Sequence, residues 1–175
     1  MTRFRSAALV AFAGSALAAS SARASVEAHE TARDVRIRVD ENGAAHVDET
    51  LHFRLLYPGW KGVDLSGVEA DASPEGQTTI TSVEGGSSPA NLTVLAPGTL
   101  RLDALDAKGL KKGDYAAHFS YREDLVANHE LVRDGALWRV TWTSAAPVDG
   151  VDGMRVVFDL PAAPTEPSAV DEEGS

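Results

Sequence analysis

The 175-residue sequence predicts an all-β fold, an antiparallel β-sandwich with the general immunoglobulin-like architecture. Apolar and polar residues alternate over several short segments, as they do in strands that bury one face. Clusters of Gly, Pro and Asn separate these segments at short, regular distances, which is typical of turns between antiparallel strands. After residue 24 no helical periodicity of useful length occurs. These three observations indicate a β protein.

The clearest predicted element is a hairpin near the start of the β region. Residues 35–39 alternate Val and Ile with charged residues, and apolar residues recur in the same way over 45–53. Between these segments lies Glu-Asn-Gly at 41–43, in which Asn and Gly both tolerate a positive φ. We therefore expect two antiparallel strands joined by this turn.

The other expected elements follow from the same two signals. Turn clusters at 57–60, 73–76 and 85–89 separate short strands expected at 78–83, 92–95 and 99–102, followed by one helical turn at 104–110. The second half is clearer, with strands expected at 115–121, 138–142 and 154–160, a turn at 133–135 and a turn-rich break at 147–153.

Residues 1–24 have the composition of a secretory signal peptide. A short basic start is followed by an uncharged apolar run and by the small-x-small site Ala-Arg-Ala at 22–24. The run is shorter than the roughly 20 apolar residues that span a bilayer. We expect cleavage before Ser25, a β domain over 25–161 in the periplasm or outside the cell, and a disordered Pro-rich, acidic tail or linker over 162–175.

Charge and composition exclude several classes of protein. Removal of residues 1–24 takes away three of the 16 basic residues and none of the 26 acidic ones, which leaves a formal charge of −13. Such a charge disfavours nucleic acids and anionic membrane surfaces. The chain has no cysteine, which excludes disulfides, thiolate metal sites, cysteine nucleophiles and a lipid anchor on cysteine. No membrane span is expected after cleavage, and the domain must be held by its apolar core.

Glu49 is the most unusual residue of the predicted strands. Strict alternation places it on the inward face with Val47 and Leu51, where an unpaired carboxylate is costly. One interpretation is a β-bulge or strand end that lets Glu49 reach solvent. The other is a buried carboxylate paired with Arg or with backbone N–H groups. A catalytic role is not indicated, because no second carboxylate or nucleophile is tied to it by spacing.

No metal site is expected from the sequence. The segments 29–33 and 129–133 both begin His-Glu, as zinc helices do, but each has Arg where the second His is needed. His46, Asp48 and His52 are expected on the solvated face of one strand, with the two His too far apart to share an ion. Residues 149–153 lack the rest of a calcium loop and are expected to form a turn. We expect no cofactor.

The three tryptophans are the candidate binding residues. Trp138 and Trp142 are expected on one face of a strand, where they serve either as core residues or as a pair on which a sugar stacks. Trp60 follows Pro-Gly in a loop and is expected to be partly exposed. We take it as the best candidate for a contact residue.

Three stretches resemble a known family. They are the turn and Val-x-Glu at 40–49, the Gly-Asp-Tyr that leads to Phe-Ser-Tyr at 113–121, and Asp-Gly-Ala-Leu-Trp at 134–138 before a strand ending Leu-Pro at 160–161. In this order they resemble the extracytoplasmic N-terminal region of the bacterial predicted-membrane-protein family called domain of unknown function 2207.

That resemblance covers about 35–161. It implies a signal peptide, an exported β domain, and then membrane helices with a low-complexity tail. It carries over no enzymatic role, and the sequence departs from the pattern because no membrane helix follows Pro161. Because Glu49 occupies a motif position in this resemblance, the interpretation of a buried, paired carboxylate is favoured over solvent exposure.

The expected function is that of a non-catalytic, exported interaction module of the bacterial cell envelope, with another envelope protein as partner. The alternative is a carbohydrate-binding sandwich that uses exposed tryptophans. If the coding sequence continues past Ser175 into an apolar segment, we expect the domain to be tethered to a membrane.

Overall fold

The computed structural model describes residues 28–134, 137–144 and 151–160. The all-β prediction is confirmed, since these residues contain strands and no helix. In chain order the strands are β1 (Ala28–Val39), β2 (Ala44–Leu55), β3 (Gly62–Ser66), β4 (Ser73–Ser82), β5 (Ser87–Ala96), β6 (Thr99–Ala104), β7 (Gly113–Asp124), β8 (Leu131–Asp134), β9 (Leu137–Val140) and β10 (Met154–Asp159).

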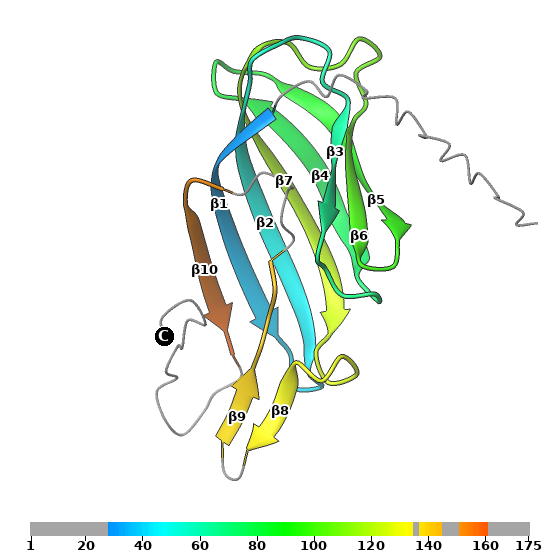
Figure 1. The fold of residues 1–175 in the computed structure, drawn as a ribbon, viewed down its shortest axis with the longest axis vertical. Coiled ribbons are helices and arrows are strands. Elements are labelled where there is room, and N and C mark those ends of the chain that lie inside the picture. Colours follow the sequence, from blue (N-terminus) through cyan, green and yellow to red (C-terminus); the bar gives the residue numbers. More distant parts are fainter. Residues whose placement is uncertain (1–27, 135–136, 145–150, 161–175) are drawn as a thin grey trace, which may run out of the picture.

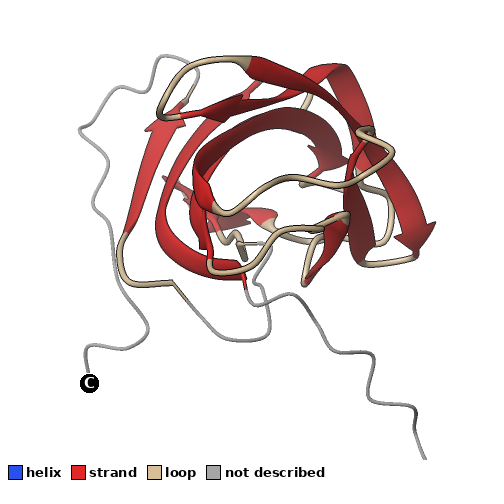
Figure 2. Ribbon diagram, turned by 90° about the horizontal axis from the view of Figure 1, so that it is seen from above, coloured by secondary structure: helices blue, strands red, loops and turns tan. Residues whose placement is uncertain are grey.

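The expected pair of antiparallel sheets is replaced by one mixed, strongly curled sheet. Eight strands pair in the order β10-β1-β2-β7-β4-β5-β6-β3, and β8 with β9 forms a separate hairpin (Figure 1). Viewed from above, the large sheet bends into a half-barrel (Figure 2).

Two local features explain the difference from a sandwich. Residues 87–89 of β5 pair with β4, whereas residues 90–96 pair with β6. The single strand β5 therefore connects the two parts of the curled sheet. The last strand, β10, runs parallel to β1, which makes the sheet mixed.

The predicted hairpin at the start of the domain is confirmed as β1 and β2. Asp40 stabilises the turn, because its Oδ1 accepts hydrogen bonds from the backbone N–H groups of Asn42 and Ala44. Gly43 has a φ of +87°, and a Cβ at this position would lie 2.3 Å from a methyl group of Val126. The turn therefore requires glycine for both its backbone conformation and its packing.

The core lies on the concave side of the curled sheet. Buried and exposed side chains alternate along β1, β2 and β7, as the sequence pattern predicts. The inner side chains of β3 and β6, including Leu65, Leu100 and Leu102, belong to the same buried cluster. The convex side of β1 and β2 carries charged and polar residues.

Several predicted elements differ from the structure. The turn expected at 73–76 is wrong, because these residues belong to β4, and β5 begins within the turn expected at 85–89. The helical turn expected at 104–110 is wrong, because Ala104 ends β6 and Leu110 forms an isolated antiparallel bridge with Trp60. The strand expected at 138–142 is shorter, since β9 ends at Val140.

The predicted signal peptide, its cleavage site and the tail at 162–175 lie outside the described residues. Within the described ranges, no helix is long and apolar enough to cross a membrane.

Candidate functional site

Glu49 lies in the middle of β2 and is fully buried on the concave face. It is opposite Val35 of β1 and Phe119 of β7, and both ladders run through this point without a register shift. The interpretation that Glu49 reaches solvent at a bulge or strand end is therefore wrong. Its Oε1 accepts a hydrogen bond of 2.8 Å from the Tyr121 hydroxyl, and its Oε2 lies 3.5 Å from Nη1 of Arg33.

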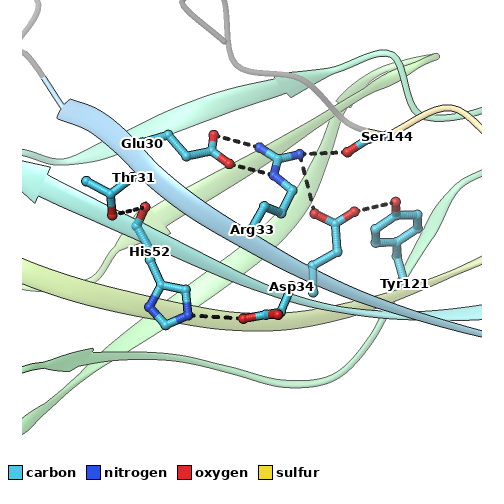
Figure 3. Close-up of polar contacts among 8 residues, drawn as sticks. Glu30, Thr31, Arg33, Asp34, His52, Tyr121 and Ser144 are labelled. Carbon is cyan, nitrogen blue, oxygen red and sulfur yellow. Dashed lines mark hydrogen bonds and ion pairs between the residues drawn. The ribbon is translucent and has the colours of Figure 1, made fainter. Parts of the chain in front are cut away.

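Arg33 is the buried cation that faces Glu49. Its Nε donates to Oε1 of Glu30 at 2.7 Å and its Nη2 to Oε2 at 2.9 Å, so the two side chains form a bidentate ion pair. Its Nη1 also donates to Oγ of Ser144 at 3.1 Å. Figure 3 shows the guanidinium between Glu30 and Ser144, on the same side of the sheet as Tyr121.

A β-bulge brings Glu30 to the inner face. Strict alternation would place Glu30 and Arg33 on opposite faces of β1. The register with β2 shifts between Glu30 and Ala32, and this extra residue changes which side chains point inward. As a result, Glu30 and Arg33 of the His-Glu-x-x-Arg segment at 29–33 form a buried ion pair.

Two further carboxylates are buried beside this group. Glu123 lies on β7, two residues after Tyr121 on the same face, and its Oε1 accepts a hydrogen bond of 3.2 Å from the backbone N–H of Glu69. Glu130 lies between β7 and β8. The second oxygens of Glu49, Glu123 and Glu130 accept no hydrogen bond from the described residues.

Burial weakens the acidity of these carboxyls. It raises the pKa of Glu49 to about 7, against the opposing effects of the Arg33 charge and the Tyr121 hydroxyl. It also raises the pKa of Glu123 and of Glu130 to about 7, and the negative charges of Glu69 and Asp71 add to both increases.

Burial also raises the pKa values of Glu30 and Tyr121. Burial raises the pKa of Glu30, although its ion pair with Arg33 opposes the change. Burial also raises the pKa of Tyr121 above its usual range, so the phenol stays neutral and acts as a donor to Glu49.

We refer to Glu30, Arg33, Glu49, Tyr121, Glu123 and Glu130 as the inner cluster. Among the buried residues of the described ranges it holds four carboxyls and one arginine, and Arg33 contacts Glu30 and Glu49. They cannot all be charged at low cost, so the cluster holds protons near neutral pH. Carboxyls of this kind suit acid–base chemistry only where a substrate can reach them. Surface hollows lie near His118 and near Lys112, and no member of the inner cluster lines either one.

The expectation that Trp60 is partly exposed is wrong. Its side chain is 4% exposed, and its ring centroid lies 5.0 Å from that of Phe53. The bridge to Leu110 holds this loop against the domain. At Gly109, with a φ of +74°, a Cβ would lie 2.6 Å from the Trp60 carbonyl oxygen, so glycine allows the close approach.

The two other tryptophans do not share one strand. Trp138 lies in β9, and its side chain is outside the described residues. Trp142 follows the end of β9, is half-buried and packs against the core. It lies near Glu123, whose pKa is raised by burial against a smaller opposing effect of the indole, and its Nε1 has no hydrogen-bond partner among the described residues.

The polar residues expected on the solvated face of β2 are paired across strands. Nδ1 of His46 lies 2.9 Å from Glu75, and Nε2 of His52 lies 3.5 Å from Asp34. Asp48 accepts hydrogen bonds from Arg38 and Ser120. Within the described part of the chain, no three His, Asp or Glu side chains are grouped to hold a metal ion. Of the expected turn at 149–153, residues 149 and 150 are outside the described ranges.

The sequence contains a signal for part of the inner cluster. Arg33 precedes Val35 and Ile37 in alternation, and Glu123 follows Tyr121 in the same way, so both are on an apolar face by pattern alone. The strands predicted there began at residue 35 and ended at residue 121, so both were missed. No pattern identifies Glu30, because the bulge changes the alternation.

The second notable region is β10, one of the two edge strands of the sheet, which has no neighbour on its outer side among the described strands and whose outer side is called the free edge. Met154, Val156 and Phe158 pair in register with Arg33, Val35 and Ile37 of β1. The β1 residues are 1%, 2% and 0% exposed, whereas their β10 neighbours are 42%, 37% and 42% exposed. The sheet therefore ends in a strand whose apolar side chains remain largely in solvent.

Comparison of the chain with protein-family models and with curated proteins gives no match.

Proposed function

We propose that this protein is an exported, non-catalytic interaction module of the bacterial cell envelope, which binds its partner through the edge strand β10. The observation that carries the proposal is the apolar free edge, where three large side chains are exposed beside fully buried neighbours. An unpaired strand edge is a ready template for another extended segment, and apolar side chains along it add binding energy.

The inner cluster supports the non-catalytic part of the proposal. Its carboxyls are buried and line neither the hollow near His118 nor the hollow near Lys112. The ion pair, the phenol and the bulge give these groups a structural role in positioning β1, β2 and β7. The signal-like residues 1–24 support export, and the resemblance to the exported region of the domain of unknown function 2207 family is consistent with it.

Crosslinking from a single engineered cysteine tests the binding edge. The natural chain has no cysteine, so Val156→Cys carries one unique site for a thiol-linked photocrosslinker at the edge. Thr93→Cys on β5 is the matched control, because Thr93 is exposed and lies away from β10. In host cells we expect a defined adduct from position 156 alone. Equal or absent adducts at the two positions would contradict the proposal.

Export is tested separately by mass spectrometry of the protein from fractionated cells. We expect the extracytoplasmic fraction to contain a chain that begins at Ser25. A chain that keeps residues 1–24 and stays in the cytoplasm would rule out this location.

A further inference from the structure

The backbone groups of β10 that point away from the sheet belong to its most apolar residues. The N–H of Arg33 donates to the carbonyl of Gly153 at 2.9 Å, and β10 runs parallel to β1 from this point. Alternate residues of a paired strand turn their N–H and C=O groups to the neighbour, so residues 155, 157 and 159 face β1. Met154, Val156 and Phe158 therefore present theirs to the free edge, which forms one border of the sheet in Figure 1.

We propose that the partner at this edge is a second copy of the chain, and that the two β10 strands pair antiparallel in a register centred on Val157. This inference rests on the proposed function, in which β10 is the binding edge, and it names the partner. Two-fold pairing of like strands is the simplest closed assembly for such an edge, because it leaves neither β10 edge free.

The charges of β10 select this register. Arg155 and Asp159 lie two residues on either side of Val157 and on the convex face of the sheet. With Val157 at the two-fold axis, Arg155 of each copy is opposite Asp159 of the other, so two attractive cross-strand pairs form. Arg155 has no ion-pair partner within the described ranges, whereas Asp159 already contacts Arg36 at 2.6 Å. In the pair, each Asp159 carboxylate would lie between two arginines.

The backbone and the apolar side chains fit the same register. Val156 is then opposite Phe158 of the second copy, and these are the residues whose N–H and C=O groups face the free edge, so they form hydrogen-bonded pairs. Met154 is opposite Leu160 on the same concave face, and both are exposed in the single chain. A register centred on Val156 would place Arg155 opposite Val157 and lose both charge pairs. A register shifted by one residue from the one centred on Val157 would place apolar side chains opposite charged ones.

Sedimentation of purified chain 25–175 over a concentration series tests the inference. One strand pair makes a small interface, so we expect a weak dimer whose fraction rises with concentration. Arg155→Glu and Asp159→Lys should each raise the dissociation constant about tenfold or more, because two attractive pairs become repulsive. An equal mixture of the two variants should recover the dimer, since every cross-strand pair in the mixed dimer is again attractive.

Val156→Pro removes the edge N–H without touching the ladder to β1, and should abolish the dimer, whereas Val156→Thr should keep it. Circular dichroism identifies any variant that fails to fold, and the mixing experiment between folded charge variants decides the register.

A wild-type chain that stays monomeric at every concentration would overturn the inference. So would a dimer that resists Val156→Pro, or charge variants that do not recover on mixing. If the chain is monomeric and the adduct at Val156→Cys contains another protein, the second copy is the wrong partner and the proposed function stands. If no adduct forms at that position, the proposed function itself fails.

Discussion

Arg33 and Arg38 lie on the same strand and both pair with carboxylates, but they lie on opposite faces of the sheet. The Arg33 side chain is 1% exposed and its partners Glu30 and Glu49 are buried with it. The Arg38 side chain is 56% exposed and pairs at 2.9 Å with a partly exposed Asp48. Water and salt screen the outer pair, whereas the inner charges are shielded from solvent, so removal of Arg33 leaves Glu30 and Glu49 without a compensating charge.

The same contrast is visible along one stretch of β1 in Figure 3. Arg33 points to the concave side, where Glu30 and Ser144 surround it, and the next residue, Asp34, points to the convex side toward His52. Neighbouring residues of one strand thus lie in different surroundings, Arg33 in the buried interior and Asp34 on the solvated face. The predictions below test this difference, from the largest expected effect to the smallest.

Arg33→Leu should have the largest effect. The substitution keeps an apolar volume on the inner face but leaves Glu30 and Glu49 without their cation. We expect the free energy of unfolding to fall by about 3–5 kcal/mol, as measured by urea denaturation at neutral pH. The double variant Arg33→Leu with Glu49→Leu is the control, and it should recover part of the loss. A loss below that of the outer-face variant would show that the inner pair is not the stronger one.

Tyr121→Phe should have a smaller effect on the same cluster. It removes the only hydrogen bond that Oε1 of Glu49 accepts within the described residues, and it changes little else in shape. We expect a loss of about 1–3 kcal/mol at neutral pH. Because a protonated Glu49 needs this donor less, the loss should shrink at pH 5. A loss that does not depend on pH would indicate a packing effect instead.

Stability should decrease as the pH rises from 5 to 8. In the folded protein Glu49, Glu123 and Glu130 have pKa values of about 7, and in the unfolded chain glutamates titrate near 4.3. Between these values the folded state holds protons that the unfolded chain has released. The stabilisation is therefore fully present below the unfolded pKa and is lost as the pH rises through 7. We expect a fall of roughly 1–3 kcal/mol for each of these carboxyls that titrates independently.

Glu49→Gln tests the origin of this pH dependence. Gln has nearly the same shape and does not titrate, so its stability should change less steeply over the same range. The Asp40 carboxylate, whose pKa is lowered by the backbone N–H of Ala44, acts in the opposite sense only in the acid range and should not contribute here. An unchanged slope in the Gln variant would assign the effect to other groups.

Arg38→Ala should have the smallest effect. Its ion pair with Asp48 is solvated, and Asp48 keeps its hydrogen bond from Ser120. We expect the free energy of unfolding to change by less than about 1 kcal/mol, and by less still at high salt. A change comparable to that of Arg33→Leu would remove the contrast between the two faces.

Much of the fold can be predicted from local pattern. Alternation predicted the first hairpin, most strands and the inward direction of Glu49, because a half-buried strand imposes a period of two on its side chains. The helical turn at 104–110 was wrong because the bridge from Leu110 to Trp60 holds this segment extended at one point. That contact joins residues far apart in the chain, so no local pattern reveals it.

The sequence by itself determined the β class, the charge and, where no bulge interrupts a strand, which residues point to the same side of it, since these depend on composition and on backbone geometry. Tertiary structure decided the single curled sheet, the burial of Trp60 and the inner position of Glu30, because these depend on strand pairing, on loop docking and on a bulge. It also decided that β10 ends the sheet with its apolar side chains exposed. Period-two alternation shows that a strand has an apolar face. Only the tertiary structure shows whether other residues cover that face.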